Sequence, residues 1–98
     1  MEIITAIKRI IETGKVDFGS ASTVKNIIND KAKIIIIASN CPKKEKESIE
    51  KYAKIGEIPV VQYPGTALQL GEVCGKPFLV ASLSVIDAGN VSLMDLKP

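Results

Sequence analysis

The first third of the chain places its hydrophobic residues with the spacing of two amphipathic helices. From Ile3 to Ile11 isoleucines recur at helical intervals, and Gly14 stands where such a helix would end. A short extended piece, residues 16–18, leads to a second helix, and we predict that Ser20 is its N-cap. The apolar face of this second helix consists of three residues, Val24, Ile27 and Ile28.

The middle of the chain predicts a buried strand followed by a charged helix. Residues 34–37 are four consecutive isoleucines, and because they do not alternate with polar residues, this strand is expected to be covered on both faces at the centre of a sheet. After a turn at residues 40–42, a charged segment with one apolar stripe predicts a helix that ends at Gly56. Pairs four residues apart, such as Glu47 and Lys51, indicate a solvated helix face.

The last third predicts a short strand, a short helix and a final strand. The short strand covers residues 59–63, and Thr66 and Gln69 then have the spacing of a capping box that opens the helix. Residues 78–86 alternate in the manner of a half-exposed strand. The polar face of this strand includes Ser82 and Ser84.

Helices and strands therefore alternate along the whole chain, beginning with a helix and ending with a strand. This order favours an α/β fold in which helical layers enclose a sheet, over a helix bundle or a barrel. We predict a three-layer α/β/α sandwich with a small mixed four-stranded sheet. The chain has 98 residues, the usual size of one domain, and no linker composition divides it, so residues 1–98 are expected to form a single domain.

The composition excludes most familiar catalytic classes. The sequence contains no histidine, which removes Ser-His-Asp and Cys-His catalysis and the usual general base near neutral pH. The two cysteines, Cys41 and Cys74, are far apart and form no CxxC pair, so neither a zinc site nor a disulfide framework is indicated. No spacing groups the carboxylates at predicted element ends, which are Asp17, Glu57, Glu72 and Asp87. We expect no catalytic residue, no metal and no cofactor.

The sequence also carries no targeting or membrane signal. The first eleven residues lack the basic start and continuous apolar stretch of a signal peptide. The longest apolar run, Ile34 to Ser39, is far shorter than the roughly 20 residues that span a bilayer. A cytoplasmic protein without membrane contact is expected.

Three segments carry groups that suit a polar ligand. Residues 19–23, at the start of the second helix, offer free N–H groups for a phosphate, unless they are an ordinary helix cap. Asn40 follows the isoleucine strand, where its amide could read a base edge or form an Asx turn or cap. In the next loop, Lys76 and Phe78 suit a phosphate and a stacked base, unless the ring belongs to the core.

Seven short segments share their wording and order with a known family. They are Thr13–Val16, Gly19–Ser20, Lys33–Asn40, Tyr52–Lys54, Ile58–Val60, Leu70–Gly71 and Cys74–Phe78. None of them is specific alone. Together they are specific, and the chain resembles the L7Ae/L30e kink-turn RNA-binding family over almost its entire length.

The resemblance implies a non-catalytic protein of the large ribosomal subunit, of archaeal or eukaryotic type, which binds a kink-turn, a sharply bent internal loop of ribosomal RNA. It also implies a cytoplasmic location, neighbouring ribosomal proteins as further partners and a monomer when free. The family's RNA surface corresponds to the start of the second helix, the turn after the central strand and the loop before the last strand. The implied RNA-binding residues are Gly19, Ser20, Ser22, Thr23, Lys25, Asn40, Val73, Cys74, Gly75, Lys76, Phe78 and Leu79.

One departure and three alternatives remain open. Ala21 and Ser22 stand where family members usually carry one or two basic residues, so a phosphate contact is expected to be missing. A stand-alone kink-turn ribonucleoprotein protein would show the same resemblance. A small-ligand-binding α/β domain that uses the Gly19 helix start, or a protein-interaction subunit, would leave the resemblance unexplained. The net charge of +2 suits recognition of a bent RNA by its shape.

Overall fold

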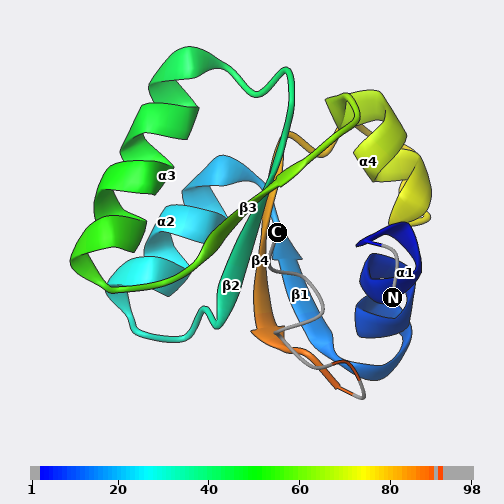
Figure 1. Cartoon of the computed structure of the whole chain (residues 1–98), viewed down its shortest axis with the longest axis horizontal. Coiled ribbons are helices and arrows are strands. Elements are labelled where there is room, and N and C mark those ends of the chain that lie inside the picture. The colour runs from blue at the N-terminus through cyan, green and yellow to red at the C-terminus, as the bar shows by residue number, and fades with distance from the viewer. Residues whose placement is uncertain (1–2, 90, 92–98) are drawn as a thin grey trace.

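Helices and strands alternate along the chain in the predicted order (Figure 1). The computed structural model describes residues 3–89 and residue 91. The helices are α1 (Ile3–Thr13), α2 (Ser20–Ile28), α3 (Lys43–Ile55) and α4 (Ala67–Val73), and the strands are β1 (Lys15–Phe18), β2 (Ile34–Ala38), β3 (Val60–Tyr63) and β4 (Ser82–Asp87). Within these residues, none of the helices combines the length and the apolar character needed to cross a bilayer.

The four strands form one mixed sheet in the order β1-β4-β2-β3. Strand β4 runs antiparallel to both of its neighbours, whereas β2 and β3 run parallel. Strand β2 therefore lies inside the sheet, and all of its residues are buried. The predicted fold class and the predicted central strand are both confirmed.

Two helical layers enclose the sheet (Figure 1). Helices α1 and α4 cover one face, and α2 and α3 cover the other. The isoleucines of β2 point alternately to these faces, so that Ile34 and Ile36 join the core under α1 and α4, while Ile35 and Ile37 join the core under α2 and α3. Fully burying a side chain of this size contributes about 1.5–3 kcal/mol. The four isoleucines therefore contribute buried apolar surface to the packing of both helical layers on the sheet.

Strand β4 differs from its prediction in length and in burial. It begins at Ser82 instead of at residue 78, because residues 78 and 79 lie in an exposed loop. Neither Ser82 nor Ser84 faces solvent, since both are 0% exposed. The expected half-exposed strand was wrong because β4 lies between β1 and β2, where helix α2 covers its polar face.

Hydrogen bonds dock helix α2 on the serine face of β4. The Asn26 amide Nδ2 donates to Asp17 Oδ2 on β1 and to Ser84 Oγ on β4, each at 2.9 Å. The predicted apolar face of α2 was partly wrong, because Ile28 is 62% exposed. The residues that the helix buries are Thr23, Asn26 and Ile27. Polar groups can fill this contact because each of them has a partner.

The surface features of α4 and α3 had different outcomes. Helix α4 opens with the predicted capping box, in which Gln69 N donates to Thr66 Oγ1 at 3.3 Å and Thr66 N donates to Gln69 Oε1 at 2.8 Å. On α3, Glu47 pairs with Lys43 at 3.9 Å and not with the predicted Lys51. The Lys51 Nζ lies instead 5.9 Å from the centroid of the Tyr52 ring.

Candidate RNA interface

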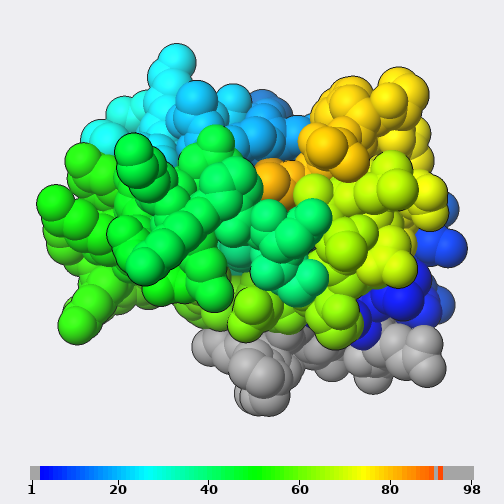
Figure 2. Space-filling model, turned by 90° about the horizontal axis from the view of Figure 1, so that it is seen from above, coloured from blue at the N-terminus to red at the C-terminus, as the bar shows by residue number. Residues whose placement is uncertain are grey.

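Three loops that are distant in the sequence meet at one edge of the sheet. We call this edge the rim and define it as residues 19–20, 39–42 and 74–81. Strands β1 and β2 end at the rim, and β4 begins there because it runs antiparallel to both. Gly19 N donates to Ser82 O at 3.0 Å, and Ser82 lies opposite Ile37 of β2. Figure 2 looks onto this edge and shows the start of α2, the loop after β2 and the loop before β4 side by side.

Gly19, and not the predicted Ser20, occupies the N-cap position of α2. Its φ of +97° lies in the region that favours glycine, and no side chain caps the helix. Ser20 is the first helical residue, and its hydroxyl donates to Glu45 Oε2 of α3 at 2.8 Å and lies 3.1 Å from Ser82 Oγ. The hydroxyl therefore connects three elements instead of closing its own helix.

The remaining candidate residues of α2 differ in exposure. Thr23 is 0% exposed and its hydroxyl donates to Gly19 O at 2.8 Å, so this side chain cannot reach a ligand. Ser22 and Lys25 are exposed, as is Gly19. The first N–H groups of a helix lack partners within the helix and stay available to acceptors. A ligand at this end of α2 would meet those N–H groups, Gly19, Ser22 and Lys25.

Asn40 is exposed, and its side chain links the loop after β2 to the start of helix α4. Its Oδ1 accepts a hydrogen bond from Ala67 N, the first residue of α4, at 2.7 Å. Ser39 reinforces this connection, because both its N–H and its hydroxyl donate to Gly65 O at 2.9 Å. The cap alternative for Asn40 is thus the observed one, although the capped helix is α4 and not the adjacent α3. Its Nδ2 has no hydrogen-bond partner among residues 3–89 and 91 and can donate to a ligand.

The loop before β4 starts with a tight turn after α4. Gly75 has φ +71°, and Lys76 N donates to Gly71 O at 2.9 Å. A Cβ at Gly71 would overlap Phe78 O, so glycine is needed for the loop to return against the helix. Cys74 is 4% exposed, and burial raises the pKa of its thiol to about 11 although the nearby Lys76 opposes the shift. The thiol packs in the core and cannot act as a thiolate nucleophile near neutral pH.

Phe78 lies at the surface, which decides between the two roles that the sequence left open. Its side chain is 51% exposed, and its ring meets Phe18 edge to face with centroids 6.3 Å apart and planes at 82°. The Lys76 Nζ lies 5.1 Å from the centroid of the Phe18 ring. The loop therefore presents an aromatic ring and a cation together, a pairing that suits a base and its phosphate.

Aliphatic side chains extend this surface onto helix α4. Leu68 is 57% exposed and Leu79 is 65% exposed. A hollow of about 440 Å³ lies there, lined by Leu68, Glu72, Lys76, Pro77, Phe78 and Leu79. Val73 lies elsewhere, since it is half-buried against the α1 and α4 core and lines a different hollow.

Sequence reasoning missed three residues of this surface. Phe18 and Leu68 flank the loop before β4, and Glu45 binds Ser20 at the start of α2. A leucine outside the buried stripe of α4 is a signal that could have identified Leu68. Nothing near Glu45 in the sequence shows that it meets α2, because 25 residues separate it from Ser20.

The carboxylates at element ends stay apart in the fold. Asp17 accepts from Asn26, and Asp87 Oδ1 accepts from Gly89 N at 2.9 Å. In the portion of the chain that the structure describes, no three His, Cys, Asp or Glu side chains gather as a metal site. The rim offers backbone donors, amide and aromatic groups, and lysines, which are the groups of a binding surface.

The chain is similar in sequence to proteins of one family, several of which are named as ribosomal proteins. Residues 1–94 match the family described as "Ribosomal protein L7Ae/L30e/S12e/Gadd45 family". A relative from Methanopyrus kandleri, named "Large ribosomal subunit protein eL30", is 45% identical over 93 residues, which cover 95% of this chain and 85% of the relative. A relative of the same name from Methanocaldococcus jannaschii is 44% identical over 96 residues, which cover 98% and 87%.

The fold has a counterpart among solved structures. A protein of unknown function from Bacillus halodurans superposes with a TM-score of 0.79 at 20% identity, covering 89% of this chain and 86% of that one. At this identity the likeness concerns the fold alone. The family match spans nearly the whole chain, and the two relatives named above are 45% and 44% identical to it. The chain belongs to the ribosomal protein L7Ae/L30e/S12e/Gadd45 family.

Proposed function

We propose that this chain is a non-catalytic protein of the large ribosomal subunit that binds a kink-turn in ribosomal RNA through the rim. The names of its curated relatives support the ribosomal assignment. Its partners are then ribosomal RNA and neighbouring ribosomal proteins, its location is the ribosome in the cytoplasm, and the free chain is a monomer.

The observation that carries the RNA proposal is the convergence of three distant loops on one edge of the sheet. These loops bring together the free N–H groups of α2, the Asn40 Nδ2 and the pair Lys76 and Phe78. RNA loops with splayed bases are bound by stacking on aromatic rings and by hydrogen bonds to base edges. A continuous surface with both kinds of group suits such a loop better than it suits a regular helix.

The candidate residues take different parts in this proposal. Exposed residues contact the RNA, the glycines through their backbone and the others through their side chains; these residues are Gly19, Ser22, Lys25, Asn40, Gly75, Lys76, Phe78 and Leu79. The buried Thr23 and Cys74 and the half-buried Ser20 support the surface from beneath, whereas Val73 lines a different hollow and has no part in it. Under this proposal, the buried small and apolar candidates contribute by shaping the surface, while the exposed candidates contact the charged ligand.

A competition experiment at one fixed salt concentration tests the proposal. A labelled kink-turn RNA is titrated with the protein, and the competitors are the same RNA unlabelled, a variant whose sheared purine pairs are replaced by Watson–Crick pairs, and free nucleotides. We expect the intact kink-turn to compete at least tenfold better than the variant, because the variant keeps the charge and loses the bend. Equal competition by both RNAs would overturn the kink-turn assignment.

A further inference from the structure

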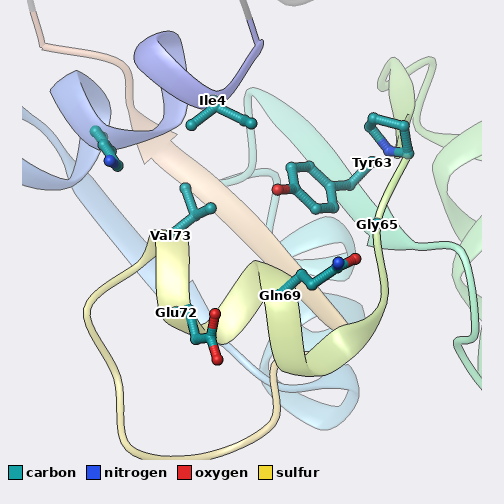
Figure 3. A pocket seen from close by; sticks show the side chains of 8 residues that line it. Ile4, Tyr63, Gly65, Gln69, Glu72 and Val73 are labelled. Atoms are coloured by element: carbon teal, nitrogen blue, oxygen red, sulfur yellow. The ribbon is translucent and has the colours of Figure 1, made fainter.

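A second hollow lies outside the rim, between helices α1 and α4 and the end of β3 (Figure 3). Its volume is about 470 Å³, and it is shallow and largely open to solvent. The residues that line it are Ile4, Lys8, Tyr63, Pro64, Gly65, Gln69, Glu72 and Val73. It adjoins the rim, because Gly65 O accepts the Ser39 hydrogen bonds.

Tyr63 directs an unpaired polar group into this hollow. The residue as a whole is 4% exposed, and its hydroxyl makes no hydrogen bond with the other described residues. Because none of their buried side-chain N or O atoms lacks a partner, the hydroxyl oxygen itself lies at the accessible surface of the hollow. Figure 3 shows the hydroxyl pointing into the space beside Ile4 and Val73. Burial, and to a smaller extent the nearby Cys74, raises the pKa of Tyr63, so the phenol stays protonated and can donate. An accessible phenol hydroxyl without a protein partner can donate to a ligand that enters the hollow.

The other residues that line the hollow supply both aliphatic and polar side chains. Ile4 is 40% exposed and Val73 is half-buried, so both offer aliphatic surface. Gln69 uses its Oε1 to accept from Thr66 N, which leaves its Nε2 as a donor. Lys8 is exposed and has no ion pair among the described residues, so it supplies an unpaired positive charge.

We propose that this hollow binds one nucleotide, with the base against Ile4 and Val73, its polar edge on the Tyr63 hydroxyl and the phosphate on Lys8. An aliphatic side chain of a protein partner would fill the walls and leave the Tyr63 hydroxyl unpaired. A nucleobase has an apolar face and a hydrogen-bonding edge, and therefore satisfies both. The site goes beyond the proposed RNA surface. The nucleotide is either an unpaired nucleotide of the RNA bound at the rim or a free nucleotide.

The four 5′-nucleoside monophosphates, titrated separately into the free chain to about 10 mM, are the first probe because weak sites bind at millimolar levels. Methyl NMR is the readout. We expect saturating shifts at Ile4 and Val73, and none at Ile28 or Ile55, two exposed isoleucines that line another part of the surface. Tyr63→Phe keeps the ring and removes the hydroxyl, and should weaken binding about three- to tenfold.

Two further variants and one RNA arm complete the test. Lys8→Gln should weaken nucleotide binding, whereas Lys54→Gln, which removes an exposed charge outside the hollow, should not. If the nucleotide belongs to the RNA, prebound kink-turn RNA blocks the monophosphates and Tyr63→Phe weakens RNA binding by a similar factor. If it is free, both ligands bind together and RNA affinity is unchanged.

The nucleotide site and the kink-turn proposal fail in different ways. If the chain does not bind the kink-turn RNA but monophosphates still shift the Ile4 and Val73 methyl signals, only the RNA proposal is overturned. The nucleotide site is overturned if no monophosphate shifts these methyls and Tyr63→Phe leaves RNA affinity intact. Melting curves of Tyr63→Phe and Lys8→Gln establish that both variants are folded.

Discussion

At the scale of single residues, the rim side chains differ in how much of their bonding capacity the protein already uses. The Ser20 hydroxyl is engaged by Glu45 and Ser82, and Asn40 has its oxygen engaged by Ala67. Phe78 has only an edge contact with Phe18 and leaves half of its surface exposed. Groups that make few contacts within the protein, above all the Phe78 ring, can contribute binding energy to a ligand.

Phe78→Ala separates RNA binding from stability. Because the ring is exposed, its removal should change the melting temperature little, whereas loss of a stacked base should weaken kink-turn binding by about 1–3 kcal/mol. The measurements are a binding titration at fixed salt and a thermal melt. Ile55→Ala is the matched control, because it removes an exposed side chain that lies outside the rim and cannot stack. A variant that melts much earlier and binds normally would assign the ring to packing.

Because the thiol of Cys74 is buried, the free energy of unfolding should decrease as the pH rises through the alkaline range. Burial raises its pKa from the ordinary 9.0 to about 11, so the unfolded chain loses this proton first as the pH rises. The stability that this group contributes is complete below about pH 9 and declines as the pH rises towards 11. Urea unfolding midpoints measured across this range should fall less steeply for Cys74→Ala than for the unmodified chain. If the urea midpoint falls equally steeply with pH in both proteins, Cys74 does not cause the loss of stability.

At the scale of elements, α2 is held by polar contacts where most helices are held by apolar ones. Its Asn26 and Ser20 meet Ser84 and Ser82 of β4 across the layer boundary. Hydrogen bonds are directional, so this arrangement sets the position of the helix start relative to the rim more strictly than apolar packing would. A helix that presents backbone donors to a ligand benefits from such a fixed position.

Asn26→Ala tests whether these contacts stabilise the fold. The substitution leaves the buried Ser84 hydroxyl and the Asp17 carboxylate without their partner, which should cost about 1–3 kcal/mol of unfolding free energy. Asn29→Ala, at the exposed end of the same helix, should stay within about 0.5 kcal/mol. Denaturant unfolding measures both. Equal stabilities for the two variants would show that α2 does not depend on its polar contacts.

At the scale of the whole molecule, a net charge of +2 is too small to attract RNA strongly without a defined surface. Carboxylates also lie close to the rim, with Glu72 near the rim lysine Lys76 and Glu45 beside Ser20. Affinity must then come from the fit of the rim to a bent RNA, with few phosphate contacts. The salt dependence of binding should accordingly be shallow.

Ala21→Lys adds a charge where the family usually carries one. The substitution should tighten kink-turn binding and increase the slope of log affinity against log salt by about one phosphate contact. Asn29→Lys is the control, because it adds the same charge at the opposite end of α2. Binding titrations at several salt concentrations distinguish them. If both variants behave alike, net charge and not the position of the helix start controls affinity.

The sequence by itself determined the features that depend on neighbouring residues. The isoleucine run of β2, the capping box of Thr66 and Gln69, and the alternation of helices and strands follow from contacts or periodicities within a few positions. They were predictable because local sterics and hydrogen bonds decide them. The three candidate loops were placed at element ends for the same reason.

The tertiary structure decided everything that depends on which elements become neighbours. The order of the sheet buried Ser82 and Ser84, and the approach of α4 engaged Asn40 with Ala67, 27 residues away. The hollow beside the Tyr63 hydroxyl lies between α1 and α4, which are more than 50 residues apart in the sequence. Periodicity shows that a face is covered but not by what, because strand order and helix packing arise from contacts between distant segments.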